Sequence, residues 1–454
     1  MKKFLRLMFI FGAFFLFNTT NVFAAVDVET EAELKLALTN GEKEINLKDD
    51  IVLLDDVHSH ATRTVGLNIQ GEGVITINGN DHSITSSLTV AVEVRASAGK
   101  TLKVIFNDIT IQGSERAVDT RSNNLTLELN KTNLSVTKSG NYQPLTIGGN
   151  AGRVTVNIKN GSVIDGGEAG YGIITFNPVD MNITESTVKG YAAIYMKESD
   201  NSEGSAGSIV NIENSLIEGN SKYSGTSDNF GTIVFNDKDI TMNIKDSIIK
   251  SVNTGTAYQV PFVNSESLTG VTENTKNIIT VEGETEIIID TQIDDESLVL
   301  NYDNSEMQVV VKSGVESNVE IPSEYLETGL ETTIDNVTGL VVVVKRYNVT
   351  LNKAQNGIVT VKENALSNEV VEVLAKPNKN YKIKNIEVLD SFGQKVQVLD
   401  NKFTMPESDV TVTVTFASDI KNPETSDNIL VDVIIACISL LSLGSAMLYL
   451  KRNN

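Results

Sequence analysis

A short phrase of alternating apolar and polar residues recurs through the middle of the chain. In each copy the alternating residues are followed by Asn, Asp or Glu, then by a small or polar residue, and finally by a second apolar pair. Alternation with a period of two is typical of a half-buried strand, and the polar break predicts a corner between two strands. The copies are VIFNDITIQG, LELNKTNLSV, VNIKNGSVIDG, MNITESTVKG, VNIENSLIEG, MNIKDSIIKS and, more weakly, ITVEGETEIII.

The spacing of these copies predicts how the strands assemble. The late apolar positions are 23, 29, 25, 29, 32 and 38 residues apart, at Ile111, Leu134, Val163, Val188, Ile217, Ile249 and Ile287. The intervening segments are too poor in helical pattern to hold crossover helices, so a parallel sheet can close only by coiling. We expect an all-β fold, a right-handed parallel β-helix over residues 25–300, with coils about 4.8 Å apart and loops of variable length.

The two ends of this β-helix need covers, because each is an open sheet edge. Thr30 and Glu33 have the spacing of a capping box, apolar residues follow them, and Gly41 can end a helix. We therefore expect an N-terminal capping helix. We interpret residues 301–346 as end-cap or linker strands.

A second, smaller β-rich module is predicted for residues 347–416. Its alternating strands are separated by Asn-Gly and Pro-Asn-Lys-Asn turns. Residues 417–428 then link this module to the C-terminal segment.

Both termini carry apolar runs. Residues 1–24 have a basic start, a short apolar run and a polar stretch, so we expect a signal peptide cleaved between Ala24 and Ala25; the alternative is an uncleaved anchor. Residues 429–450 form 22 consecutive, mostly apolar positions. As a helix they would be about 33 Å long, enough for a single-pass transmembrane helix. The basic residues of the tail at 451–454 would stay in the cytoplasm.

The segment directly before this apolar run contains Asn422, Pro423, Glu424, Thr425 and Ser426. The order of short motif, apolar span and basic tail resembles the sorting signal of sortase substrates in Gram-positive bacteria. Asn422 and Ser426 replace the commoner Leu and Gly of that pattern. The resemblance implies cleavage after Thr425 and attachment of its carboxyl to cell-wall peptidoglycan; the alternative is a plain single-pass membrane anchor.

Charge and composition exclude several classes of function. The net charge is −22; the first 24 residues carry +3 and the last 29 carry zero, which leaves −25 on the body between them. Such a body repels phosphate backbones, so we expect no nucleic-acid binding. It would also repel polyanions such as pectate unless basic residues or calcium intervened. One Cys and no Trp exclude an intrachain disulfide and Trp-lined sugar platforms.

The acidic residues at the corners are the main candidates for catalysis. Asp108, Glu185 and Asp246 recur at one phase of the repeat, with Asn160 and Asn214 at matching positions. Stacked carboxylates would shift one another's pKa and could serve a lyase or a hydrolase. We favour a structural turn, because Asn and Asp tolerate left-handed backbone. We therefore predict no catalytic, cofactor-binding or metal-binding residues.

Other polar groups are interpreted in the same way. The acidic groups at 49–50, 55–56 and 294–296 could hold Ca²⁺, but no calcium-loop pattern is present, so calcium is the weaker alternative and we expect no cofactor. We take the remaining candidates as surface or turn residues, namely His58, His60, His82 and the glycine pairs at 148–149 and 166–167.

Two resemblances cover most of the exported body. The capping helix, the first strand and the phrase VITINGNDHSI resemble the pectate-lyase-like superfamily, and more narrowly the pectate-lyase-like adhesive domains of Gram-positive surface proteins. The second module resembles the bacterial surface repeat related to the internalin B-repeat, through Gly357, Ala375, Pro377 and residues 403–406. Ile386 lies near the place of that family's usual Trp.

These resemblances imply a non-enzymatic cell-surface adhesin or structural display protein. The β-helix loops would contact glycan or host-matrix ligands, and the longest are at 198–208, 220–229 and 251–277, with Tyr223 and Tyr258 among their residues. The alternative is a polysaccharide lyase or glycoside hydrolase on the same fold. That alternative predicts charged side chains from different coils converging in one groove.

Overall fold

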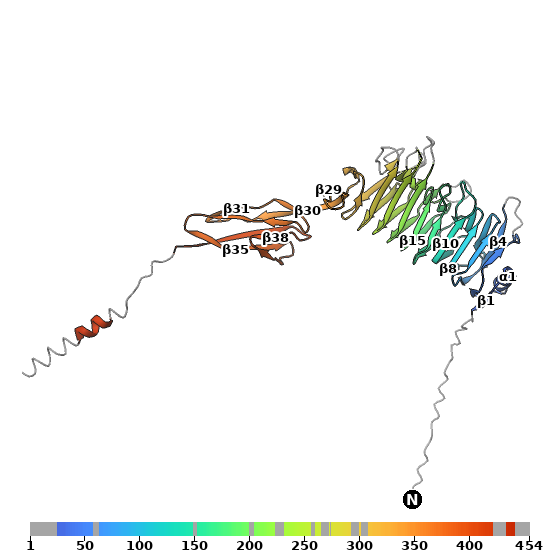
Figure 1. Cartoon of the computed structure of the whole chain (residues 1–454), viewed down its shortest axis with the longest axis horizontal. Coiled ribbons are helices and arrows are strands. Elements are labelled where there is room, and N and C mark those ends of the chain that lie inside the picture. Colours follow the sequence, from blue (N-terminus) through green and yellow to red (C-terminus); the bar gives the residue numbers. More distant parts are fainter. Residues whose placement is uncertain are drawn as a thin grey trace, which may run out of the picture. The chain divides into compact units, whose positions relative to one another are not determined.

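The computed structural model describes residues 25–57, 63–148, 152–198, 204–222, 231–255, 259–264, 272, 274–291, 299–300, 307–420 and 433–440. The chain divides into two compact units at the bond between Lys345 and Arg346. The first unit is a stack of parallel strands, drawn from blue to yellow in Figure 1.

Three parallel sheets make up the first unit. The first sheet holds β1 (Val26–Val28), β2 (Glu44–Leu47), β5 (Gly73–Asn78), β8 (Leu102–Gly113), β10 (Leu125–Val136), β12 (Val154–Lys159), β15 (Val179–Thr184), β18 (Ile209–Glu213), β21 (Thr241–Lys245), β24 (Asn277–Glu282) and β27 (Met307–Val311). The second sheet holds β3 (Ile51–Leu53), β6 (Ser83–Ser86), the second halves of β8 and β10, β13 (Val163–Asp165), β16 (Thr187–Gly190), β19 (Leu216–Ser221), β22 (Ile248–Asn253), β25 (Glu286–Thr291) and β28 (Glu316–Ser317).

The third sheet follows the other two in each coil. It holds β4 (Val65–Gly71), β7 (Val90–Ala96), β9 (Arg116–Thr120), β11 (Leu145–Ile147), β14 (Ile173–Thr175), β17 (Ile194–Lys197), β20 (Gly231–Asn236), β23 (Val260–Asn264) and β26 (Val299–Leu300). Each described strand of this third sheet pairs only with the corresponding strand of the coils before and after it, always in parallel. This arrangement agrees with the predicted parallel β-helix.

The recurring phrase explains this register. Its first half forms a strand of the first sheet and its second half a strand of the second sheet, so Leu127 pairs with Val156 and Val156 with Met181. These inward side chains are fully buried in one continuous core. One predicted core position is wrong: Ile164 is buried and pairs with Leu134, whereas Val163 faces outward. The cause is Gly161, an extra corner residue with a φ of +79°.

The corners between the first two sheets have left-handed backbone, as the turn interpretation predicts. The φ angles are +50° at Asp108, +56° at Asn160, +49° at Glu185, +50° at Asn214 and +48° at Asp246. A short polar side chain tolerates this conformation better than a branched one. The left-handed backbone at the corners therefore explains why Asn, Asp and Glu recur at these positions of the repeat.

A ladder of buried hydroxyl groups lies directly behind these corners. The backbone N–H of Ser186 donates to Oγ of Ser215 at 3.1 Å, and the N–H of Ser215 donates to Oγ of Ser247 at 3.1 Å. The N–H of Ser247 continues the series to Oγ1 of Thr285 at 3.3 Å. Each hydroxyl thus satisfies a buried donor of the preceding coil, which explains the Ser or Thr behind the corner in the copies from LELNKTNLSV onward; the first copy has Ile109 at this position.

The N-terminal end is closed by helix α1 (Glu31–Thr39), and the predicted capping box is confirmed. Thr30 Oγ1 accepts the N–H of Glu33, and the Glu33 carboxylate accepts the N–H of Thr30. Leu34 and Ala37 are buried in the core of the β-helix. Gly41, with a φ of +79°, follows the last turn.

At the other end, β27 and β28 complete the last coil, and the 3₁₀-helix η1 (Ser323–Tyr325) and strand β29 (Leu330–Ile334) follow. Strand β30 (Val341–Leu351) runs across the boundary between the units. It pairs antiparallel with β28 and β29. Farther along it pairs antiparallel with β32 and parallel with β39, both strands of the second unit.

The second unit is all β and has its own core. Besides β30 it contains β31 (Gly357–Thr360), β32 (Asn364–Leu366), β33 (Val370–Glu372), β34 (Leu374–Pro377), β35 (Tyr381–Asp390), β36 (Lys395–Val396), β37 (Val398–Leu399), β38 (Lys402–Thr404) and β39 (Val410–Ser418). Phe403 and Met405 are buried in that core, which accounts for the conspicuous FTMP segment. Gly357 packs against the tip of the Phe416 ring, where an added Cβ would come within 2.4 Å of Cζ.

The expected signal peptide at 1–24 and the sorting motif from Asn422 to Ser426 lie outside the described residues. Of the expected membrane span, the structure describes a helix at 433–440. Among the described residues, none of the helices has both the length and the apolar composition needed to cross a bilayer. The transmembrane helix therefore stays a prediction from the sequence.

Candidate functional site

The outer face of the third sheet carries two carboxylates on neighbouring coils. Asn68 of β4 pairs with Glu93 of β7, and Glu93 pairs with Asp119 of β9. The Glu93 and Asp119 side chains are 0% exposed. Because a buried carboxylate needs a counter-charge, its surroundings must supply cations.

Four arginines supply that charge and form, with the two acids, what we call the arginine cluster. Arg63 pairs with Glu93 and, at 3.2 Å, with Asp119. Arg95 donates to Glu93 at 2.9 Å. Arg116 and Arg121 donate to Oδ2 of Asp119 at 3.2 and 2.8 Å.

The arginine cluster holds more positive than negative charge. Four guanidinium groups face two carboxylates, a formal excess of +2 in a chain whose net charge is −22. Burial lowers the pKa of Arg63; the Asp119 charge opposes this shift, and the nearby arginines 121, 116 and 95 add to it. The neighbouring Glu115 forms an ion pair with Lys138 at 2.5 Å, so it does not offset the excess positive charge of the arginine cluster.

The local sequence explains why these side chains share a face. In Glu93-Val94-Arg95 and again in Asp119-Thr120-Arg121, an acid and an arginine stand two residues apart. In a strand, residues two apart point to the same side, and here that side is outward. Sequence reasoning missed this cluster, although two acid-x-Arg motifs 26 residues apart were the available signal.

Aromatic side chains gather on the same outer face, a few coils farther along. The rings of Tyr171 and Tyr191 are 5.9 Å apart and nearly perpendicular, and those of Tyr171 and Tyr195 are 5.2 Å apart. Nζ of Lys197 lies 5.6 Å from the Tyr195 ring centre and 5.8 Å from that of Phe176. We call this group the aromatic cluster. Burial raises the pKa of Tyr171 above its usual value.

One column of outward residues joins the two clusters. Asp119 pairs with Thr146, Thr146 with Ile174, and Ile174 with Tyr195. Three coil steps of about 4.8 Å separate Asp119 from Tyr195 by about 14 Å along the stack. Thr146 and Ile174 between the clusters are only 2% and 5% exposed, so the accessible groups are arginines at one end and half-buried rings at the other. Cations and aromatic rings are both groups that bind polar ligands in proteins.

The acids singled out in the sequence do not converge in this way. Asn214 stands between Glu185 and Asp246 at successive corners, so these two carboxylates are two coils, or about 10 Å, apart. Asp108 is three corners before Glu185. A shallow hollow of about 530 Å³ runs over the corners from Gly161 to Asp246, but its walls carry acids and hydroxyls without a cation.

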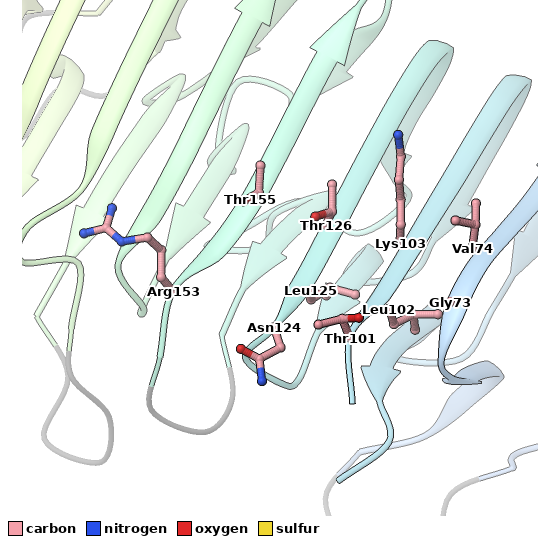
Figure 2. A pocket seen from close by; sticks show the side chains of 10 residues that line it. All are labelled: Gly73, Val74, Thr101, Leu102, Lys103, Asn124, Leu125, Thr126, Arg153 and Thr155. Atoms are coloured by element: carbon pink, nitrogen blue, oxygen red, sulfur yellow. The ribbon is translucent and has the colours of Figure 1, made fainter. Parts of the chain in front are cut away.

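A second hollow, of about 460 Å³, lies on the outer face of the first sheet at the starts of β5, β8, β10 and β12 (Figure 2). Lys103 and Arg153 are its charged residues, and Thr126 and Thr155 lie between them. Both cations are already paired: Lys103 with Glu128 at 2.7 Å and Arg153 with Asp180 at 2.5 Å. This hollow therefore has no surplus charge to offer a ligand.

The acidic residues and histidines considered as metal ligands lie at different places in the structure. Within the described residues, no group of three His, Cys, Asp or Glu side chains could hold a metal ion. The Asp49 and Asp50 carboxylates accept backbone N–H groups, that of Asp50 from Ser83. His82 lies at a corner, where its N–H donates to Gly79. His58, His60 and the acids at 294–296 lie outside the described residues.

Comparisons with known proteins bear on both units. Residues 25–164 match the family described as a pectate lyase-like adhesive domain, and residues 347–420 match the divergent InlB B-repeat domain. Among curated proteins none matches. A solved structure described as L. reuteri 53608 SRRP is 14% identical, covers 65% of this chain and 96% of its own, and gives a TM-score of 0.40.

Proposed function

We propose that this protein is a non-enzymatic adhesin of the bacterial cell surface whose β-helix binds a glycan or host-matrix ligand. One coincidence carries the proposal: the segment that matches an adhesive domain, residues 25–164, contains every member of the arginine cluster. The InlB B-repeat match of the second unit supports a location outside the cell. The ligand-binding surface would be the outer face of the third sheet.

The rival function, a polysaccharide lyase or hydrolase, gains one observation from the structure. Charged side chains from three coils do converge, as that alternative requires. Both carboxylates of the cluster are nevertheless fully buried and bonded to guanidinium groups, so neither can reach a sugar to give or take a proton. The arrangement favours binding over catalysis.

A binding screen tests the adhesin proposal. The chain from Ala25 to Ile420, which ends within the predicted linker and contains the described residues of both units up to that point, is applied to an array of glycans and matrix proteins. Binding to at least one class of immobilised ligand is expected, without release of oligosaccharide from any uronate polymer. Release of oligosaccharide from a uronate polymer by this protein would support the enzyme instead.

For anchoring, we propose export through the N-terminal signal and attachment to the wall at Thr425. The support is the sequence order of motif, apolar span and basic tail. Replacing Thr425 by Ala should move the protein from the wall fraction to the membrane fraction of fractionated cells. An unchanged distribution would leave the plain membrane anchor as the better interpretation.

A further inference from the structure

Two of the four arginines in the cluster are only partly used by the fold. Arg95 gives one N–H to Glu93, and Arg116 gives one to Asp119, within the described part of the chain. Each guanidinium has five N–H donors. Their side chains are 37% and 26% exposed, so part of each side chain reaches the surface.

Glu93 and Asp119 would each keep an arginine partner if Arg95 and Arg116 were removed. Glu93 keeps its bond from Arg63, and Asp119 keeps Arg63 and Arg121. The Nε of Arg63 is buried and finds no acceptor among the described residues. A guanidinium group with unused donors, held in a low-dielectric setting beside other cations, favours an incoming anion.

We propose that the arginine cluster is the binding site for an acidic glycan, whose carboxylate or sulfate groups are held by Arg95 and Arg116. The planar guanidinium fork matches the two oxygens of either group, which an ammonium does not. The inference rests on the proposed adhesin function and names the chemistry of its ligand. The arginine cluster also supplies the basic residues that this acidic chain needs in order to bind a polyanion.

The aromatic cluster extends this site along the stack. Tyr195 lies three coils beyond Asp119, in the same column of outward residues. A glycan chain running across the strands would place an acidic unit on the arginines and a later unit on the tyrosine rings, about 14 Å away. Length as well as charge should then raise the affinity.

The test compares three polymers with one backbone: unmodified dextran, carboxymethyl-dextran and dextran sulfate. Binding of the chain from Ala25 to Ile420 is measured at low salt and at about 0.15 M salt, since exposed charge pairs weaken with ionic strength. We expect binding to at least one acidic dextran and much weaker binding to the neutral one. A preference between the two acidic polymers identifies the anion.

The decisive variant is Arg95→Gln/Arg116→Gln, which leaves each carboxylate with an arginine partner and so should fold. We expect it to weaken acidic-dextran binding by about tenfold or more. The matched control, Arg153→Gln/Lys189→Gln, removes the same charge from outside the cluster and should change binding by less than about twofold. The double lysine variant at 95 and 116 keeps the charge, and it should recover only part of the affinity.

Two results would overturn the proposal. One is an equal loss in the glutamine variant and in the matched control, which would mean general attraction without a site. The other is wild-type protein that binds neither acidic dextran. In that second case, array binding to a neutral glycan or a matrix protein would still support the adhesin, so the two proposals fail separately.

Discussion

Replacing Asp119 by Asn tests the arrangement on which the site depends. Oδ2 of Asp119 lies 2.8 Å from Arg121 and 3.2 Å from each of Arg116 and Arg63. The amide of Asn keeps the shape of the side chain but removes the charge, so three guanidinium groups would remain together with one carboxylate fewer. The fold should lose stability, and the loss should be electrostatic.

The expected size follows from burial. Breaking a buried ion pair by removing one partner costs about 3 to 5 kcal/mol. The three guanidinium groups keep 15 to 26% of their surface exposed, which lowers the penalty. We therefore expect a loss of about 3 kcal/mol in the free energy of unfolding of the first unit, and a smaller loss in about 1 M salt.

Urea denaturation followed by circular dichroism measures this loss. The matched control is Asp180→Asn, which breaks the more exposed pair with Arg153 and should cost less than about 1 kcal/mol. A loss at Asp119 no larger than that of the control would refute the reasoning. So would a loss that does not change with salt.

Three further predictions concern the frame around the site. Ser215→Ala removes the acceptor for the buried N–H of Ser186 and should cost about 1 to 3 kcal/mol in urea denaturation. Gly357→Ala places a Cβ against the Phe416 ring and should destabilise the second unit by about 1 to 3 kcal/mol, measured by its own thermal transition. Burial alone would raise the pKa of the Glu128 carboxyl, but hydrogen bonds from its two lysine partners lower that pKa below 4.5. The stabilisation from ionised Glu128 should therefore be complete above about pH 4.5 and be lost as the pH falls further. Glu128→Gln should flatten that part of the plot of stability against pH.

Each of these has a control in the chain. Ser83 lies at a more exposed corner, so Ser83→Ala should cost less than Ser215→Ala. An added Cβ at Gly71 would meet only ordinary contacts, so Gly71→Ala should be nearly neutral. The exposed Glu213 pairs with a single lysine, so Glu213→Gln should cost less stability at neutral pH than Glu128→Gln. Equal effects in variant and control would contradict the corresponding prediction.

Local features were predictable from the sequence because they depend on residues close together in the chain. The capping box needs only Thr30 and Glu33, and most left-handed corners need only their own Asn, Asp or Glu, with Lys131 at a φ of +51° as an exception. The inward alternation also fixed which faces are buried. Its one failure, at Val163, came from a single inserted glycine that shifted the strand by one residue.

The arginine cluster could not be derived in the same way. Its members come from three coils joined by loops of different length, so their alignment depends on the register between strands. A glutamate and an aspartate 26 residues apart look unrelated until β7 and β9 are paired. The aromatic cluster has the same origin, because Tyr171 precedes β14 whereas Tyr195 belongs to β17.

A crystal structure of the chain from Ala25 to Ile420 with a short carboxymethyl- or sulfo-dextran would test the central claim most directly. The account predicts an acidic group within hydrogen-bonding distance of Arg95 and Arg116, with the chain running across β11 and β14 toward Tyr195. A ligand bound instead at the hollow beside Lys103 and Arg153, or at the corners, would contradict it.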